Sequence, residues 1–218
     1  MDSEAEIKGN MDRMYRWTRH FYDASRKYYL LGRDELIHKL MCKDGEHVCE
    51  IGCGTARNLI KMAQLYPQAS FYGMDVSDEM LKTAQKSVEN SDLENRITLK
   101  QGFAESFDAK TLFDLDITFN KIVFSYSLSI IPPWKEAIDH ALKTLPVGGE
   151  IHIVDFGGMG GLPKWFQKLM FWWLARFHVF YKPEILEQLK GLVEEKQGTL
   201  NVTSLYNGYA YLAVFKKT

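Results

Sequence analysis

Short apolar runs alternate with segments of helical periodicity along most of the chain, and this alternation predicts an α/β fold. The first apolar run ends at Ile51, and the helix after it carries Leu59, Ile60 and Ala63 up to a break at Pro67. Further strands are expected at 70–74, 97–99, 122–124 and 150–156, and further helices at 11–40, 78–88, 134–145 and 183–190. No linker divides these units, which favours one domain.

The C-terminal end of the chain predicts a β-hairpin. Its strands are expected at 200–206 and 209–216, joined by Asn207-Gly208, a dipeptide typical of a tight type I′ turn. An antiparallel hairpin that closes a series of parallel units favours a mixed sheet. The glycine-rich segment 157–161 is expected to be a flexible loop.

A glycine turn follows the first strand. Gly52 and Gly54 let the backbone turn sharply and let a ligand approach the main chain. Glu50 lies within the otherwise apolar strand, where a carboxylate is costly unless something binds it. Asp75 ends the second strand, at the position where nucleotide-binding α/β units hold the ribose hydroxyls. The alternative is an ordinary strand-to-helix turn. Arg57 occupies the place of the third dinucleotide-fingerprint glycine, which disfavours NAD.

The pattern Glu-x-Gly-x-Gly-Thr at 50–55, with Asp-Val-Ser-x-x-Met at 75–80, resembles the class I S-adenosyl-L-methionine (SAM)-dependent methyltransferases. The resemblance implies a Rossmann-like seven-stranded sheet with a C-terminal antiparallel hairpin, SAM as cofactor, a glycine turn against the methionine part, and Asp75 on the ribose. It also implies that the loop at 101–105 closes on the adenine, although Phe103 has the alternative of burial in the core. The expected cofactor-binding residues are Arg33, Glu50, Gly52, Cys53, Gly54, Thr55, Asn58, Asp75, Val76, Met80, Gly102, Phe103, Ala104, Glu105, Ser125 and Ser127.

A second resemblance is narrower. Tyr22-Asp23 with Tyr28-Tyr29-Leu30-Leu31-Gly32-Arg33-Asp34, and the run at 125–132, resemble the diacylglyceryl-homoserine N-methyltransferases of betaine lipid synthesis. The resemblance implies three successive methylations of a lipid headgroup amine. Open alternatives are an N-methyltransferase for phosphatidylethanolamine or a soluble amine, and a SAM-binding regulator without turnover.

The first forty residues are expected to form a helical lid on the methyltransferase domain at 41–218. The segment 16–34 is dense in aromatic and cationic residues, which suits either a lid or a simple amphipathic cover helix. If the segment is a lid, Arg33 or Arg26 is expected to bind a carboxylate of the ligand. The tyrosines expected to hold the methylated cation are Tyr22, Tyr28, Tyr29 and Tyr126. Ser125 and Ser127 follow a strand, so they are expected to face the transferred methyl group.

Composition narrows the class of protein further. The 218 residues are 46% hydrophobic and 25% charged, with a formal net charge of −1, which indicates a globular protein and gives no sign of nucleic-acid binding. Cys49 and Cys53 have no second pair, which disfavours a structural zinc site, and three cysteines fit a reducing compartment. No apolar run reaches the ~20 residues of a membrane span, and 1–10 is too polar for a signal peptide. These features predict a cytoplasmic enzyme.

The segment 164–177 is unusual because aromatic and aliphatic side chains cover more than half of its predicted helix. It contains Trp165, Trp172 and Trp173, with Lys164 and Lys168 on the remaining face. This composition suits a membrane interface or an acyl-chain channel, and it predicts peripheral membrane association. The alternatives are a wide core face and a subunit interface of a homodimer.

Overall fold

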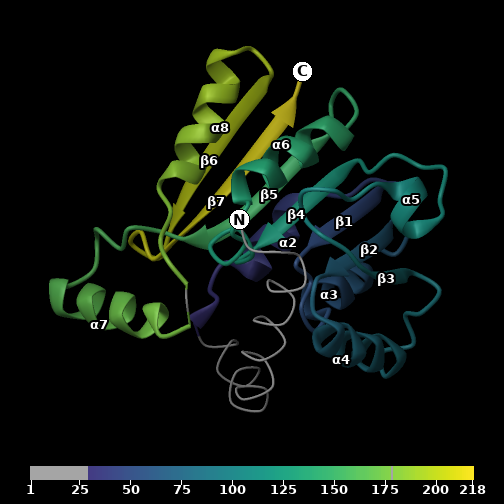
Figure 1. Cartoon of the computed structure of the whole chain (residues 1–218), viewed down its shortest axis with the longest axis horizontal. Coiled ribbons are helices and arrows are strands. Elements are labelled where there is room, and N and C mark those ends of the chain that lie inside the picture. The colour runs from purple at the N-terminus through teal and green to yellow at the C-terminus, as the bar shows by residue number, and fades with distance from the viewer. Residues whose placement is uncertain (1–28, 178) are drawn as a thin grey trace.

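The computed structural model describes residues 29–177 and 179–218, whose strands form one seven-stranded mixed sheet (Figure 1). The strand order is β3-β2-β1-β4-β5-β7-β6. The strands are β1 His47–Ile51, β2 Ser70–Asp75, β3 Ile97–Gln101, β4 Lys121–Ser125, β5 Glu150–Phe156, β6 Gly198–Leu205 and β7 Ala210–Lys217. The first five are parallel, and β7 runs antiparallel to both β5 and β6. The expected Rossmann-like class I sheet with a C-terminal hairpin is confirmed.

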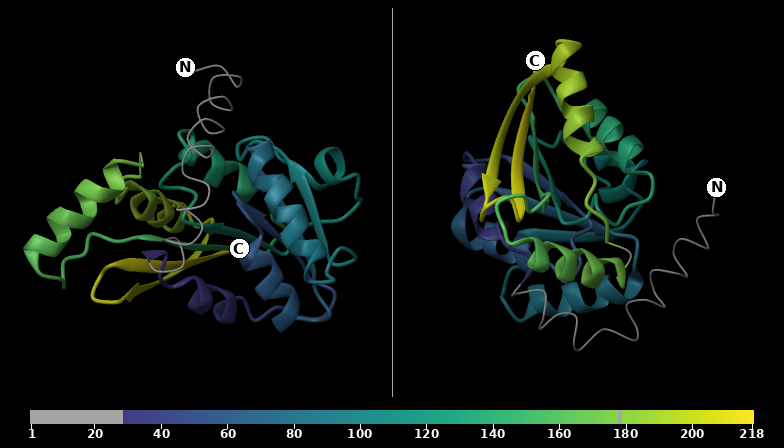
Figure 2. Two further views of the ribbon diagram at one scale, coloured as in Figure 1. Left: turned by 90° about the horizontal axis from the view of Figure 1, so that it is seen from below. Right: turned by 90° about the vertical axis from the view of Figure 1, so that its left-hand side faces the viewer.

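Helices cover both faces of this sheet (Figures 1 and 2). They are α2 Arg33–Leu40, α3 Arg57–Leu65, α4 Asp78–Glu89, α5 Ala109–Phe113, α6 Trp134–Thr144, α7 Lys164–Ala175 and α8 Glu184–Glu194. Buried residues of α2, α3 and α4 pack with Val48 and Val123, and those of α5, α6 and α8 pack with Cys49 and Ile122. Since alternate residues of one strand enter opposite cores, both faces of the central strands are apolar.

Local signals set most of these boundaries. Ser77 caps α4 as predicted, because its Oγ accepts a hydrogen bond of 3.4 Å from the Met80 amide. The short helix α5 was not expected. It is capped by Asp108, whose Oδ1 accepts from the Lys110 and Thr111 amides at 2.9 and 3.0 Å. At the C-terminal side, α8 runs on to Glu194 instead of ending near 190, and α7 ends at Ala175 instead of 177.

The hairpin turn has the predicted centre, between Asn207 and Gly208, but it is longer than predicted, because it comprises residues 206–209 and the last strand pair is Leu205 with Ala210. Within it, Tyr206 and Asn207 have φ values of 51° and 57°, and the Gly208 amide donates to the Leu205 carbonyl at 3.1 Å. A tyrosine at positive φ is disfavoured locally, so contacts from elsewhere in the fold must stabilise the turn.

Those contacts come from the glycine-rich segment after β5. The Met159 and Gly161 amides donate to the Gly208 and Asn207 carbonyls at 2.8 and 3.1 Å. A Cβ on Gly157 would lie 2.3 Å from the Gly208 carbonyl oxygen, so this glycine permits close backbone approach. The segment is a loop, as predicted, and it is anchored against the hairpin by hydrogen bonds, while its flexibility stays a prediction.

The expected lid falls mostly outside the described residues, which include only 29–40 of it. Two long-range hydrogen bonds hold the start of this part on the sheet. Tyr209 Oη donates to the Tyr29 carbonyl at 2.8 Å, and Tyr126 Oη donates to the Leu31 carbonyl at 2.5 Å. Both tyrosines lie near the end of β5, so the chain before α2 passes over the carboxyl edge of the parallel strands. No helix in the described part of the chain is long and apolar enough to cross a membrane.

Candidate functional site

The glycine turn after β1 is fixed between the ends of β2 and β4. The Gly52 and Cys53 amides both donate to the Met74 carbonyl, at 2.8 and 3.0 Å. Gly52 has a φ of 73°, and a Cβ at this position would lie 2.8 Å from Cβ of Ser127. Glycine is thus required both by the backbone angle and by the close approach of the segment after β4.

Glu50 presents a buried carboxylate at this edge. Its side chain is 1% exposed, and its Oε1 accepts a hydrogen bond of 2.7 Å from Asn58 Nδ2. Its Oε2 is buried with no hydrogen-bond partner among the described residues. Burial raises the pKa of Glu50 to about 7, although Asn58 and the charge of Arg33 act to lower that pKa. An unsatisfied buried carboxylate oxygen is costly, and the ammonium group of a bound SAM would satisfy it.

A polar chain links this carboxylate to α2. Arg57 donates from Nη1 to Asn58 Oδ1 at 3.0 Å and from Nη2 to Asp34 Oδ1 at 2.7 Å. Arg57, which occupies the place of the third dinucleotide-fingerprint glycine, therefore contacts Asn58 on one side and Asp34 on the other. The sequence indicated that Arg57 disfavours NAD but gave no sign of its partners, because Asp34 is distant along the chain.

Asp75 organises the neighbouring loop. It is 7% exposed, and its two oxygens accept hydrogen bonds from the Gly54 amide at 2.9 Å and the Ser77 amide at 3.0 Å. Asp75 therefore fixes both the glycine turn and the start of α4. The ribose role stays a prediction.

The loop expected at the adenine begins where β3 ends. The Gly102 amide donates to the Asp75 carbonyl at 3.2 Å, and Gln101 Nε2 donates to the Val76 carbonyl at 2.9 Å, so this loop lies against the end of β2. Phe103 is half-buried, whereas Ala104 beside it packs into the core. Among the other expected cofactor residues, Cys53 and Met80 are buried, and Thr55, Val76 and Glu105 are half-buried.

Three alternate serines follow or end β4. The hydroxyls of Ser125 and Ser127 are buried without a hydrogen-bond partner among the residues that the structure describes, and the buried hydroxyl of Ser129 faces the carboxylate of Asp155. Buried hydroxyls need such partners, so this row fits contact with a polar ligand. Two of the serines were expected at the site, and Ser129 was missed, although the alternating Ser-x-Ser-x-Ser pattern was a visible signal.

The expected tyrosines are only partly described, since Tyr22 and Tyr28 lie outside the described residues. The ring of Tyr126 meets Phe156 edge-on, with centroids 4.6 Å apart, and its hydroxyl donates to the Leu31 carbonyl. Burial raises the pKa of Tyr126 well above its ordinary value, so this hydroxyl is not a base at neutral pH. Tyr29 meets Trp173 edge-on at 4.6 Å between centroids. Both rings anchor the segment before α2, and their catalytic role stays a prediction.

Arg33 begins α2 directly after Gly32, whose φ is 85°. Its Nε donates to the Leu30 carbonyl at 3.0 Å, and its charge acts on the carboxylate of Glu50. The first turn of α2 thus brings a guanidinium toward the buried acid. Contact of Arg33 with a carboxylate of cofactor or acceptor stays a prediction.

Asp155 is the other buried acid at the carboxyl edge. It is 2% exposed and accepts from the Ser129 amide at 3.0 Å and from its neighbour Phe156 at 2.8 Å. Burial raises the pKa of Asp155 to about 6. Lys182 donates to the Leu128 carbonyl at 2.9 Å from the other side. These contacts hold the segment that carries the serine row.

Comparison with known proteins identifies the family of this chain. A family model described as a methyltransferase domain matches residues 42–203. The demethylmenaquinone methyltransferase of Listeria welshimeri is 27% identical over 144 residues, which cover 66% of this chain. The chain spans about 58% of the length of that relative.

Solved structures share the fold at low sequence identity. An O-methyltransferase family protein from Burkholderia thailandensis superposes with a TM-score of 0.71 at 17% identity, over 94% of this chain and 62% of that one. Phosphoethanolamine N-methyltransferase 2 from Haemonchus contortus, in complex with S-adenosylhomocysteine, gives a TM-score of 0.72 at 15% identity, over 97% and 60%. These two likenesses concern the fold alone.

Proposed function

This chain belongs to the methyltransferase domain family and is a class I, SAM-dependent enzyme, and on that premise we propose that it methylates a lipid headgroup amine. The acceptor is diacylglyceryl-homoserine, and the product is the trimethylated betaine headgroup. Glu50, Gly52 and Asp75 hold the cofactor at the carboxyl edge of β1 and β2.

The observation that carries the acceptor assignment is the hydrogen bond from Tyr126 Oη to the Leu31 carbonyl. It joins the two segments that resemble the diacylglyceryl-homoserine N-methyltransferases, one before α2 and one after β4. These segments are far apart in the sequence and meet beside the buried serine row. This contact supports an acceptor site between the two segments.

Methyl transfer to an amine makes modest demands on the protein. Bound SAM supplies a methyl group that its sulfonium already makes electrophilic. The chain must hold the amine in line, and positioning of this kind can lower a barrier by roughly 7–11 kcal/mol. A pocket that excludes water lowers the pKa of an ammonium, which favours the neutral amine that attacks. Tyrosine faces then stabilise the methylated cation by about 0.5–2 kcal/mol each. No strong dedicated base is required.

The second candidate is methylation of a carbon acceptor on a lipid quinone. The similarity to the demethylmenaquinone methyltransferase of Listeria welshimeri, at 27% identity, favours it. The two candidates share a lipid acceptor and differ in the atom that is methylated. Phosphatidylethanolamine, a soluble amine and a regulator without turnover are further outcomes that the same assay separates.

The deciding experiment is incubation of the full chain with methyl-labelled SAM and one acceptor at a time. The acceptors are diacylglyceryl-homoserine, phosphatidylethanolamine and demethylmenaquinol in matched vesicles, and ethanolamine in solution. We expect label only in the mono-, di- and trimethylated homoserine headgroup. Gly52→Val is the matched inactive control, since its side chain would enter the space of Ser127. Label in the quinone would replace the proposal with the second candidate, and SAM binding without any labelled product would indicate a regulator.

A further inference from the structure

Helix α7 divides into an inner and an outer face. Trp165, Leu169 and Trp172 are 68%, 51% and 61% exposed, and their spacing places them on one side of the helix. Phe166, Met170 and Trp173 pack against the core, and Leu174 is buried within it. The sequence alone had assigned all of these residues to one wide apolar surface.

The inner face of α7 connects to the carboxyl edge of the sheet. Trp173 meets Tyr29 edge-on at 4.6 Å, and Tyr29 lies parallel to Phe156, the last residue of β5, at 6.5 Å between centroids. Figure 1 shows α7 at the lower left of the molecule, below α8. The inner face of α7 therefore reaches the end of β5 through the ring of Tyr29.

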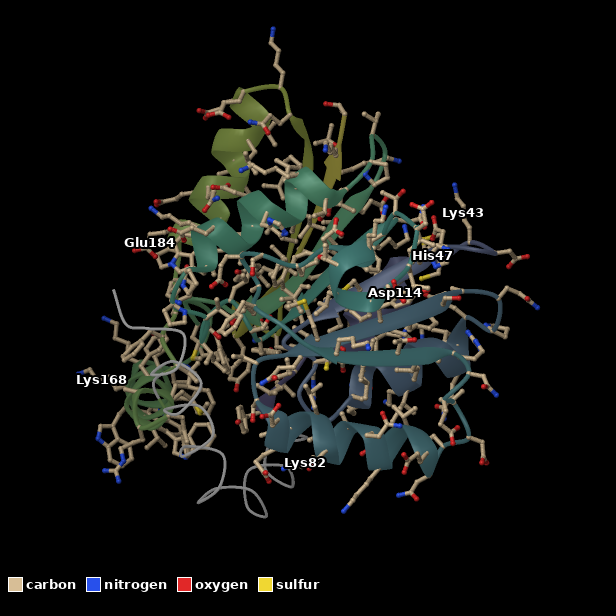
Figure 3. All side chains as sticks on the ribbon, turned by 45° about the vertical axis from the view of Figure 1, so that its right-hand side comes forward. Lys43, His47, Lys82, Asp114, Lys168 and Glu184 are labelled. Carbon is tan, nitrogen blue, oxygen red and sulfur yellow. The ribbon has the colours of Figure 1, made fainter. Side chains whose placement is uncertain are left out.

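The charged side chains of α7 and of the segments on either side of it are all basic. No aspartate or glutamate occurs between Asp155 and Glu184, while Lys164, Lys168 and Arg176 are exposed along α7 and at its end. The Arg176 guanidinium lies 5.9 Å from the ring centre of Trp172. Figure 3 shows the Lys168 side chain pointing away from the body of the molecule.

We propose that Trp165, Leu169 and Trp172, flanked by these three cations, dock on the surface of an anionic lipid bilayer. This set is called the α7 outer face below. Tryptophan favours the headgroup level of a bilayer because it combines an apolar ring with a polar N–H, and Lys and Arg are attracted to anionic lipids. A second copy of the chain is disfavoured as the occupant, since lysine is depleted in protein interfaces and these cations would face their own copies.

The role of this docking surface rests on the proposed function, because an enzyme that methylates a lipid headgroup must reach its substrate in a membrane. With the outer face on the headgroups, the inner face holds the carboxyl edge of the sheet toward the same membrane. An acceptor lipid then needs to rise only past one helix to reach the methyl donor. Docking thus assigns the exposed aromatic residues a role in substrate access.

The test is sedimentation of the full chain with vesicles of phosphatidylcholine, with and without phosphatidylglycerol. Trp165→Ser combined with Trp172→Ser should weaken binding to the anionic vesicles at least tenfold, with the melting temperature and SAM affinity unchanged. Met41→Ser combined with Val147→Ser is the matched control, because these side chains are 72% and 78% exposed outside α7. Trp173 is left unchanged in both variants because it packs against Tyr29.

Lys164→Glu combined with Lys168→Glu tests the charge separately. It should abolish the preference for anionic vesicles and leave weak binding to phosphatidylcholine. Undiminished vesicle binding by the tryptophan variant would overturn the proposal, as would a change from dimer to monomer in that variant with vesicle binding intact. If wild-type protein binds vesicles through α7 but labels no lipid, the proposed reaction fails and the docking surface stands.

Discussion

Replacing Glu50 by glutamine offers a test of the cofactor site through stability as well as binding. The folded state holds the Glu50 carboxylate in a buried place, which raises its pKa from the ordinary 4.5 to about 7. At about 1.36 kcal/mol per pH unit, the charged form then costs the folded state about 3 kcal/mol above neutral pH. Glutamine has nearly the same shape, carries no charge, and keeps a carbonyl to accept the hydrogen bond from Asn58.

The sign follows from the direction of the pKa shift. Since the pKa is higher in the folded state, Glu50 does not destabilise the protein below about pH 4.5, and its cost grows as the pH rises to about 7. Glu50→Gln should therefore melt several degrees above wild type at about pH 8, given roughly 2–4 °C per kcal/mol for a chain of this size. The difference should become small at about pH 4.5. Asp155 titrates in both proteins, so the comparison isolates Glu50.

Calorimetric melting with and without SAM completes the measurement. Wild type should gain stability from SAM, and the glutamine variant should gain much less, because the ligand ammonium loses its anionic partner. Glu94→Gln, at an exposed position, is the control and should change neither property. A variant that is less stable than wild type at about pH 8 and still binds SAM equally well would refute the assignment of Glu50 as a ligand-binding carboxylate.

Three further substitutions have defined outcomes. Asp75→Ala should raise the SAM dissociation constant roughly 10–150-fold, which is the equivalent of about 1.5–3 kcal/mol for one hydrogen bond to a charged group. Titration calorimetry on the folded variant measures this constant, and an unchanged affinity would mean that the ribose site lies elsewhere. Arg33→Ala should weaken binding of SAM or of a carboxylate headgroup more than Lys39→Ala, an exposed cation on the same helix, and equal effects would make Arg33 a surface charge. Lys121→Met should lower the free energy of unfolding in urea by about 1.5–3 kcal/mol at neutral pH, because Glu150 loses its 2.7 Å partner. The pKa of Glu150 is lowered to about 2, chiefly by His152, so that loss should shrink as the pH falls from 4.5 toward 2, and a constant loss would contradict it.

The order of strands and helices could be predicted because each signal is local. β5 has the predicted bounds, and Ser77 caps the helix that it was expected to cap. Glu50 and Asp75 could be singled out for the same reason, since a carboxylate in an apolar run is anomalous in the sequence itself. The glycines of the turn indicate a positive φ, which other residues rarely adopt.

Contacts between distant segments could not be predicted in this way. The partner of Arg57 is Asp34 on another helix, and the four-residue hairpin turn at 206–209 is held by the Met159 and Gly161 amides, which donate to the Gly208 and Asn207 carbonyls. The short helix α5 has too few residues to show a helical period, and only its cap at Asp108 was visible. For Arg57 and for the hairpin turn, the deciding group lies elsewhere in the fold.

Helix α7 shows most clearly the difference between what the sequence determines and what the tertiary structure determines. The sequence by itself determined that 164–177 is helical, aromatic and free of acidic residues, because composition and period are properties of the segment alone. Only the tertiary structure decided that Trp173 faces inward while Trp165 and Trp172 face outward. The physical reason is that a helical period fixes which side chains share a face, whereas burial depends on which neighbours, here Tyr29 and the end of β5, come to cover that face.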